Sequence, residues 1–276
     1  MTTLPVYDSA APRTPLLTEF RNFWRYRGLI RLLVTRELTT RYKRSVLGVW
    51  WTLLNPILTT AVLWLVFSLV SKEFGATTEP FVVYLLAGVL MVTFFSQGIL
   101  ATGAAITNSS AILSKVYVPA EVFAFSTALA GLANFIISLI PLVLAQLVTG
   151  VGIPWTALLT PIPILATLAL VTGLGMLIAA LAVYFFDVLD LTRVLVQLLY
   201  YLTPVFWTLK FIPERFHGLV QANPLYSYLE VFRDLMYRGV ISPLWQWAVV
   251  GGCAVLFLAL GVWVFSKSWK TLVAQL

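Results

Sequence analysis

The sequence predicts an all-α integral membrane protein with six transmembrane helices, and three observations point to this fold class. Of the 276 residues, 60% are hydrophobic and only 11% are charged, whereas a soluble domain carries roughly one-quarter charged residues. Several apolar runs reach the roughly 20 residues that a helix needs to cross a hydrocarbon core about 30 Å thick. The lysines and arginines are also divided unequally between the two sides of these runs.

The six predicted spans follow the apolar runs in chain order. They are Thr52 to Val70, Phe81 to Gly103, Val122 to Val148, Trp155 to Phe186, Leu191 to Leu209, and Leu244 to Phe265. The third and fourth runs exceed a straight crossing, and Pro141, Pro161 and Pro163 are candidate kink sites in them. We therefore divide the chain into a cytoplasmic tail with an interface helix, residues 1–51, and a transmembrane permease domain, residues 52–276.

The charge distribution predicts the orientation of the chain. Six crossings place both termini on one side, where thirteen of the eighteen lysines and arginines lie, and five lie on the other side. By the positive-inside rule, both termini are expected to be cytoplasmic, in the cytoplasmic membrane. The net charge of +7 is explained by this topology, so no nucleic-acid partner is expected. The first apolar run is too long for a signal peptide, which predicts that it stays in place.

Several kinds of chemistry are disfavoured by what the sequence lacks. No Asp, Glu, Lys, Arg or His lies between the ends of the predicted spans, apart from Arg193 near the start of the fifth. Ion-coupled transporters usually keep such groups, so secondary active transport is disfavoured. Cys253 and His217 are single residues of their kinds, which predicts no metal site. The stretch GVWVFSKS, residues 261–268, lacks the second glycine of a phosphate-binding loop, so we expect no cofactor in this chain and no catalysis.

Arginines and aromatic residues recur through residues 20–44, as in a helix that lies in the membrane interface. A solvated basic tail attracted to anionic lipid heads is the alternative. Gly48 and the tryptophans after it are expected to turn the chain from the membrane surface into the bilayer. One face of the first span carries three large apolar residues at heptad spacing: Trp50, Ile57 and Trp64. That face is either a lipid-facing stripe or a pore lining.

Two connections have helical character. In the stretch ITNSSAILSKVYVPAEVF, Ser109 or Ser110 is a candidate N-cap and Pro119 a stop, which predicts a small amphipathic helix. Its apolar residues favour docking on the membrane or in a groove of a cytosolic partner. The last outer connection, Lys210 to Pro243, contains helical pieces broken by prolines. It is either a surface cap or a segment that folds partly back into the bilayer.

Three motifs stand out along the chain. The first, in TRELTTRYKRSVLGVWWTLLNP, comprises Arg36, Glu37, Leu38, Arg41, Tyr42, Lys43, Ser45, Leu47, Gly48, Trp51, Leu54 and Pro56. The second, in NSSAILSKVYVPAEVF, comprises Asn108, Leu113, Lys115, Pro119 and Glu121. The third, in NPLYSYLEVFRD, comprises Asn223, Pro224, Phe232 and Arg233. With these motifs the chain resembles the permease subunits of type-2 ABC exporters that move lipid-linked polysaccharides such as O-antigen, capsule, teichoic acid and galactan precursors.

The resemblance implies partners as well as a fold. The family pairs two six-span permeases with two cytosolic ATPases that hold ATP and Mg, so the partners implied here are a second copy of the chain, an ATPase dimer, membrane lipids and a polyprenyl-pyrophosphate-linked polysaccharide. It implies a coupling helix over Ser110 to Val118, with contact residues Asn108, Ser110, Leu113, Lys115, Tyr117, Pro119 and Glu121. It also implies an interface helix at the membrane entrance, with Arg36, Glu37, Arg41, Tyr42, Lys43 and Arg44. Short gating helices between spans five and six would carry Asn223, Pro224, Phe232 and Arg233.

The resemblance places a channel between the first and fifth spans of two protomers. In the fifth span, Tyr200, Pro204 and Trp207 are predicted to share one helical face. Sugars present C–H faces that pack on aromatic rings. The lining candidates are Trp50, Trp64, Tyr200, Tyr201, Phe206 and Trp207. Core packing or an interfacial belt is the alternative role of these rings. The basic residues of the entrance would bind a lipid pyrophosphate or serve topology alone.

Two other functions remain open on the sequence. One is an ABC permease of the same architecture for a small drug or lipid. The other is a membrane enzyme acting on polyprenyl lipids, for which Asp187 and Asp190 are the only acidic pair in the inner loops.

Overall fold

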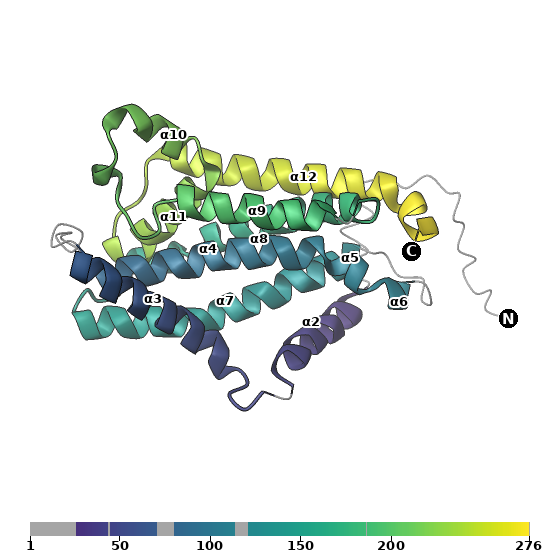
Figure 1. Cartoon of the computed structure of the whole chain (residues 1–276), viewed down its shortest axis with the longest axis horizontal. Coiled ribbons are helices and arrows are strands. Elements are labelled where there is room, and N and C mark those ends of the chain that lie inside the picture. The colour runs from purple at the N-terminus through teal and green to yellow at the C-terminus, as the bar shows by residue number, and fades with distance from the viewer. Residues whose placement is uncertain (1–25, 44, 71–79, 114–120, 186, 276) are drawn as a thin grey trace.

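The computed structural model describes residues 26–43, 45–70, 80–113, 121–185 and 187–275, and these residues form helices without any strand. Six long helices lie alongside one another in a bundle (Figure 1). They are α3 (Trp50–Val70), α4 (Phe81–Gly103), α7 (Glu121–Thr149), α8 (Pro161–Ala182), α9 (Asp187–Leu202) and α12 (Leu244–Gln275). The predicted all-α class is confirmed.

The remaining helices and turns lie at the two ends of the bundle (Figure 1). The end where α12 stops, which we call the terminal end, carries α2 (Arg27–Tyr42), α5 (Ala105–Asn108) and α6 (Ser110–Leu113). The opposite end, which we call the cap end, carries η1 (Trp155–Leu159), η2 (Leu209–Phe211), η3 (Glu214–Phe216), α10 (His217–Gln221), α11 (Pro224–Arg233) and the π-helical turn η4 (Asp234–Arg238).

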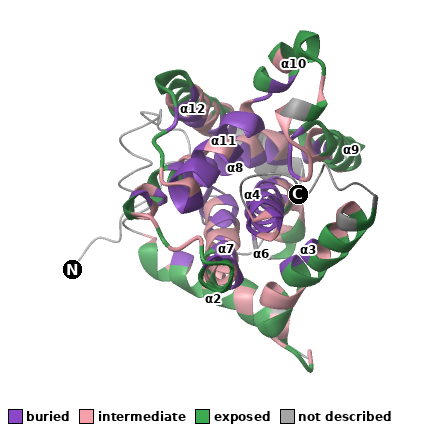
Figure 2. Cartoon of the chain, turned by 90° about the vertical axis from the view of Figure 1, so that its left-hand side faces the viewer, coloured by how far each residue is buried: buried purple, intermediate pink, exposed green. Residues whose placement is uncertain are grey.

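Helix α4 is the centre of the bundle. It packs against α3, α7, α8, α9 and α11, and the end view in Figure 2 shows its buried residues surrounded by the other helices. In the most apolar stretch of α4, 78% of the residues are buried, whereas in the corresponding stretch of α3 only 11% are buried. Helices α3 and α9 thus lie on the periphery with most of their side chains uncovered.

Two glycines allow α8 and α12 to touch through their backbones. A Cβ atom on Gly173 would lie 2.3 Å from the carbonyl carbon of Phe257, and one on Gly261 would lie 2.4 Å from the carbonyl oxygen of Gly173. Inside a membrane, the hydrophobic effect does not drive helices together, so close packing of small residues is a main source of helix association. Helix α8 of this pair packs in turn against α4.

Five described helices are long and apolar enough to cross a membrane: Trp50–Phe67, Phe81–Gly103, Glu121–Thr149, Trp155–Ala182 and Leu244–Lys267. The predicted fifth span, Leu191 to Leu209, is wrong at both ends, because α9 begins at Asp187 and ends at Leu202. Its 16 residues rise about 24 Å, less than the roughly 30 Å hydrocarbon core. The helix ends before Pro204 because a proline disfavours helical geometry in the residue before it. The count of six spans stays a prediction.

Two other predicted spans differ from the structure at their ends. The run Trp155 to Phe186 is divided, because a 3₁₀ turn ends at Leu159 and Pro161 begins α8 as its first residue. Helix α12 continues past the predicted end at Phe265 to Gln275. Residues 261–268 are therefore regular helix, which excludes the wrapped loop that phosphate binding requires. Pro141 lies inside α7, which is assigned as one helix.

The two predicted cytoplasmic helices are found in part. The interface helix, predicted over residues 20–44, is α2 within the described part of the chain, and residues 20–25 and Arg44 lie outside it. Helix α2 packs against α7, with Ile30 buried beside Ile106 and Phe123. Of the predicted coupling helix, only α6 is described. Lys115, Tyr117 and Pro119 lie outside the described residues.

Candidate functional site: a polar cavity and a buried arginine cluster

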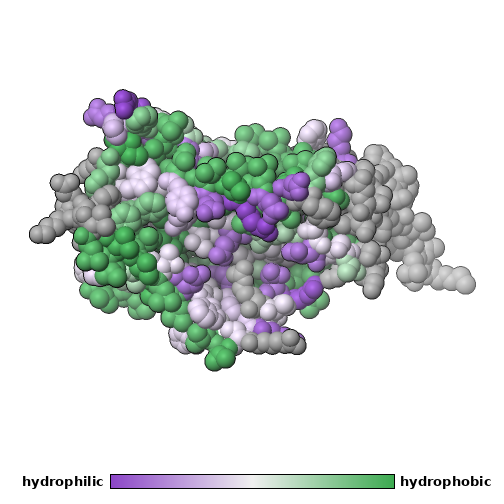
Figure 3. Space-filling view, viewed as in Figure 1, coloured by the Kyte–Doolittle hydropathy of each residue, from purple (hydrophilic) through white to green (hydrophobic). Residues whose placement is uncertain are grey.

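One face of the bundle carries polar side chains on otherwise apolar helices. In Figure 3, hydrophilic residues gather along α9 and over the space between α9 and α2. On α9 the exposed polar residues recur with helical spacing at Asp190, Arg193, Gln197 and Tyr201, and Arg193 forms an ion pair with Asp190. Polar side chains on membrane helices generally face a water-filled space or the protein interior. This spacing favours an aqueous passage along α9.

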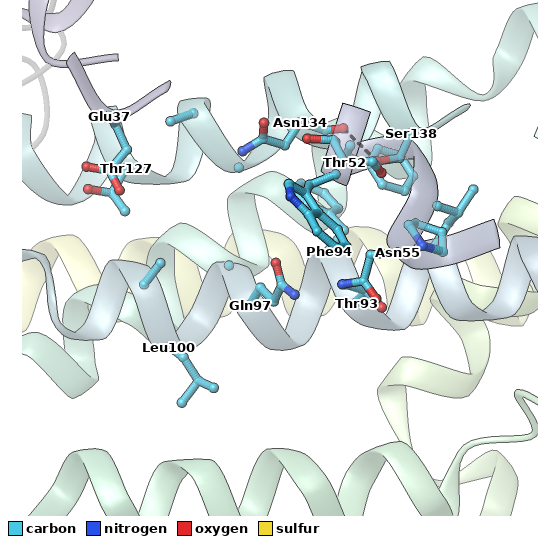
Figure 4. A pocket seen from close by; sticks show the side chains of 18 of the residues that line it. Glu37, Thr52, Asn55, Thr93, Phe94, Gln97, Leu100, Thr127, Asn134 and Ser138 are labelled. Atoms are coloured by element: carbon cyan, nitrogen blue, oxygen red, sulfur yellow. Dashed lines mark hydrogen bonds between the residues drawn. The ribbon is translucent and has the colours of Figure 1, made fainter. Parts of the chain in front are cut away.

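A cavity of about 650 Å³ opens on the same face, between α2, α3, α4 and α7 (Figure 4). Its walls combine uncharged polar groups with aromatic rings and small residues. The polar side chains are Glu37, Tyr42, Thr52, Asn55, Thr93, Gln97, Thr127, Asn134 and Ser138, and the aromatic ones are Trp51, Phe94 and Phe135, besides Tyr42. Glu37 is the only residue among these lining residues that carries a formal charge.

Hydrogen bonds fix one end of this cavity. The Tyr42 hydroxyl donates to Oδ1 of Asn134 at 2.7 Å and also contacts Oγ1 of Thr52. Ser138 donates through Oγ to the Thr52 carbonyl at 3.2 Å. These bonds join the last turn of α2, the first turn of α3 and the middle of α7.

Other polar groups of the cavity are not used in this way. Among the described residues, no intramolecular hydrogen bond involves the side chains of Glu37, Gln97 or Thr127. Gln97 is exposed and projects from α4 into the cavity in Figure 4. An amide offers two donors and an acceptor, so this side chain is available to a ligand or to water.

The chain turns at Gly48, between α2 and α3, and the path of this turn into the bilayer stays a prediction. Gly48 has a φ of 50°, a left-handed conformation that favours glycine, and its N–H donates to Oγ of Ser45 at 3.1 Å. Helix α3 begins two residues later at Trp50, which is exposed like Trp51 and Trp64. The α2–α3 turn therefore positions the cavity wall formed by Tyr42 and Trp51.

At the cap end, a charged side chain that lies outside the predicted spans is buried within the bundle. Arg233 on α11 is 0% exposed. Its Nη1 donates to the Pro204 carbonyl at 2.8 Å and to Oε1 of Glu230 at 3.0 Å. Its Nη2 donates to the Tyr84 carbonyl at 3.1 Å and to the Val205 carbonyl at 3.0 Å. The guanidinium also lies 3.6 Å from the centre of the Tyr84 ring, so it is held on α4 and on the turn after α9.

Further charges complete what we call the arginine cluster, namely Glu230, Arg233, Asp234 and Arg238. Arg238 donates to Oε2 of Glu230 at 2.6 Å and to Oδ1 of Asp234 at 2.8 Å. Burial raises the pKa of Glu230, but the guanidiniums of Arg233 and Arg238 outweigh burial and hold that pKa below its ordinary value. Ser242 donates to Oδ2 of Asp234 at 2.7 Å. The cluster therefore keeps Glu230 ionised although it is largely buried.

A glycine and a capping asparagine position this cluster. A Cβ atom on Gly88 would lie 2.6 Å from Nη2 of Arg233, so only glycine leaves room for the guanidinium against α4. Asn223 caps α11 by accepting from the Leu225 N–H at 3.0 Å, and its Nδ2 donates to Oγ1 of Thr203 at 3.0 Å. Pro224 occupies the first helical position, where the missing N–H has no cost.

Helix α11 of the last connection folds back into the helix bundle. It packs against α4, α8 and α12, and the ring centres of Phe232 and Phe135 are 5.9 Å apart. The Tyr84 hydroxyl donates to the Trp207 carbonyl at 2.6 Å. The sequence alone was not interpreted as placing a charged cluster inside the bundle. The apolar residues on both sides of Glu230 and Arg233 nevertheless indicate that this charged segment is buried.

The predicted aromatic lining is only partly brought together. Tyr200 and Tyr201 lie on α9, but the predicted common helical face with Pro204 and Trp207 is wrong, because the helix has ended by then. Phe206 lies in the following turn and stacks on Phe67 of α3, with ring centres 5.6 Å apart. This contact joins the cap-end parts of α3 and the α9–α10 connection.

The predicted cytoplasmic residues are distributed over the terminal end. Asn108 is exposed and Ser110 half-buried, whereas Leu113 and Glu121 are buried. Arg36, Glu37 and Lys43 are exposed on or next to α2. His217 is half-buried and has Nε2 at 2.9 Å from the Ile212 carbonyl oxygen. No group of three or more His, Cys, Asp or Glu residues that could hold a metal ion occurs in the described residues.

Comparison with known proteins agrees with this architecture. The family model described as ABC-2 type transporter matches residues 28–237. An O-antigen export system permease protein RfbA of Myxococcus xanthus is 32% identical over 79% of this chain and 84% of its own length. Two proteins of the same name from Klebsiella pneumoniae are 25% and 23% identical, over 78% and 87% of this chain and 82% and 91% of their lengths. The chain is a multi-pass membrane protein that belongs to the ABC-2 type transporter family.

Proposed function

We propose that this chain is the transmembrane subunit of an ATP-driven exporter that moves a lipid-linked polysaccharide across the cytoplasmic membrane. The observation that carries the proposal is the polar face of α9 together with the adjoining cavity, which offers amide, hydroxyl and aromatic groups. Such groups suit the hydroxyls and C–H faces of sugars. The relatives named as O-antigen export permeases support the same substrate class.

The proposal requires a second copy of the chain. Helices α3 and α9 are peripheral, and α9 exposes a polar face beside apolar residues such as Leu195 and Leu198. A single bundle leaves this polar face open to lipid, where it is unfavourable. Two copies that face each other through α3 and α9 enclose the polar surfaces in a water-filled passage. Trp50, Trp64 and Tyr201, all exposed, are then placed along its wall.

The energy is proposed to come from a separate cytosolic ATPase dimer that holds ATP and Mg. The one stretch with partial likeness to a phosphate-binding loop is regular helix, and ABC-2 family membership supports an ATPase partner. The terminal end, with α5, α6 and the end of α12, is proposed to face the cytoplasm and that partner. Asn108 and Ser110 are accessible there, and the chain itself is proposed to be non-catalytic.

The two ends of the passage receive different roles. Arg36 and Lys43, which are exposed near the α2–α3 turn, are proposed to attract the pyrophosphate of the lipid carrier. At the cap end, α11 with Asn223, Phe232 and Arg233 is proposed to form part of the outer gate. The tight bonds of the arginine cluster support a rigid frame for that gate.

The test is transport by the purified complex. The chain and its ATPase are reconstituted in inside-out vesicles that contain the host's lipid-linked glycan, and glycan that becomes protected inside the vesicles is measured. We expect ATP-dependent protection that is lost when the ATPase cannot hydrolyse ATP. Transport of a small drug or an unglycosylated lipid, without glycan transport, would instead support a permease with another substrate.

A further inference from the structure

We propose that the cavity between α2, α3, α4 and α7 is a binding site for an uncharged sugar unit of the exported glycan. This inference rests on the proposed function and adds to it a site within one protomer, separate from the passage between two copies. Its volume of about 650 Å³ lies within the roughly 300–1,000 Å³ typical of small-molecule sites.

The polar groups in the cavity have the chemistry that sugar hydroxyls require. Gln97 offers an amide N–H₂ and a carbonyl, and Thr93 and Thr127 offer hydroxyls that both donate and accept. Asn55 offers an amide N–H₂, while its carbonyl oxygen accepts from the Thr59 hydroxyl at 3.4 Å. Sugar hydroxyls also donate and accept, so each can be matched without an unpaired partner. Trp51 is half exposed and lines the same space, where its indole ring can pack against the C–H face of a sugar.

The division between bonded and available groups singles out the part of the cavity that would contact the sugar. Tyr42, Thr52 and Asn134 already bond one another across three helices. Gln97 and Thr127 have no such bond among the described residues. The bonded set holds the walls at one end, and the available set remains for an exchangeable occupant.

The charge of the lining argues against the two other parts of a lipid-linked glycan. Among the described side chains, no lysine or arginine lines the cavity and Glu37 is the one lining residue with a formal charge, so these side chains repel a pyrophosphate rather than neutralising it. An acyl or prenyl chain would bury Gln97 and Thr127 without hydrogen-bond partners, which is unfavourable for polar side chains. An uncharged sugar avoids both penalties.

The experiment measures binding of lipid-free glycan to the full complex in nanodiscs. The probe is the radiolabelled oligosaccharide that mild acid releases from the host's own lipid-linked pool, so it has neither the lipid nor the pyrophosphate. We expect Gln97→Leu to raise its Kd about tenfold and Thr127→Val to raise it about threefold, because each removes a hydrogen bond to the ligand. Gln221→Leu replaces an exposed glutamine on α10, away from the cavity, and should leave the Kd unchanged.

Two competitors separate the parts of the natural substrate. Inorganic pyrophosphate and free polyprenol are expected not to displace the labelled oligosaccharide. The inference is wrong if the wild-type complex does not bind the probe, if Gln97→Leu and Gln221→Leu bind it equally, or if polyprenol displaces it. Vesicle transport of the lipid-linked glycan by the wild-type complex is measured in parallel. Transport without this binding overturns the sugar site alone, and absence of transport overturns the proposed function.

Discussion

The arginine cluster at the cap end and the polar cavity near the terminal end both place polar side chains within an apolar bundle, but they differ in how those groups are satisfied. Arg233 is fully buried and its two terminal nitrogens make four hydrogen bonds. In the cavity, Gln97 and Thr127 make none within the described part of the chain. A buried charge is stable only with close partners, whereas an open cavity can leave groups to water or a ligand. The contrast separates a fixed structural element from a surface suited to a changing occupant.

The largest expected effect follows from breaking the arginine cluster. Arg233→Leu leaves three backbone carbonyl oxygens without this donor and removes one cation from Glu230. Removing one partner of a buried ion pair typically costs about 3–5 kcal/mol. We expect a loss of that size in the free energy of unfolding, measured by SDS titration of the purified protein in mixed micelles.

Arg215→Leu is the matched control for this substitution. Arg215 lies in the same connection but is exposed, with its guanidinium 4.7 Å from the centre of the Phe216 ring. Surface substitutions usually change stability by less than about 0.5 kcal/mol. Similar losses in both variants would show that the cluster is not the stabilising element of the cap end.

A smaller effect is expected from filling the space beside the guanidinium. In Gly88→Ala the new methyl group would lie 2.6 Å from Nη2 of Arg233 and 3.0 Å from the Val205 carbonyl oxygen. Because Arg233 is held by four hydrogen bonds, it cannot move away freely. Overpacking of this kind costs about 1–3 kcal/mol, which thermal unfolding of the purified protein would detect.

Gly251→Ala tests whether this loss comes from the contact rather than from the change of residue. Gly251 lies on α12 and a Cβ atom there would meet nothing within 4 Å. Alanine is the better helix former by about 1 kcal/mol, so this variant should be as stable as the wild type or more so. If Gly251→Ala loses as much stability as Gly88→Ala, the proposed crowding around Arg233 is wrong.

The bonded end of the cavity should respond more weakly. Tyr42→Phe removes the hydroxyl that contacts Asn134 and Thr52, and a typical hydrogen bond contributes about 1 kcal/mol net. We expect a loss of about that size in thermal or SDS unfolding, because water can reach the two groups left behind. Tyr201→Phe, at an exposed position on α9, should lose less than half as much. Equal losses would mean that the Tyr42 hydroxyl does not stabilise the α2–α7 contact.

The sequence predicts the two regions unequally well. Apolar runs locate α4 and α7 to within a residue or so, because membrane thickness fixes how long such a run must be. The end of α9 depends on Pro204. This proline is a local signal that the predicted fifth span, which continued to Leu209, did not take into account. The burial of Arg233 depends on the Tyr84 carbonyl, 149 residues away in the chain, and on the missing side chain of Gly88. No local pattern contains that contact.

The cavity shows the same limit. The motif at Glu37, Tyr42 and Trp51 was identified from the sequence as one segment, but its partner on α7, Asn134, was not. A single asparagine in an apolar run carries no indication of which helix it will face. Its bond to Tyr42 arises only when α2 packs against α7.

The smallest effect on stability, and the sharpest test of the open face, is expected from Trp64→Leu. Trp64 is exposed on α3, so the substitution should change the free energy of unfolding by less than about 0.5 kcal/mol. If α3 lines a glycan passage, loss of the indole removes a surface on which sugars pack, and the rate of glycan protection in vesicles should fall severalfold. Trp263→Leu, also at an exposed position but on α12, across the bundle from α3 in Figure 2, should leave that rate unchanged. An equal fall in both variants would indicate that these rings anchor the protein in lipid, and a passage wall on α3 would then be excluded.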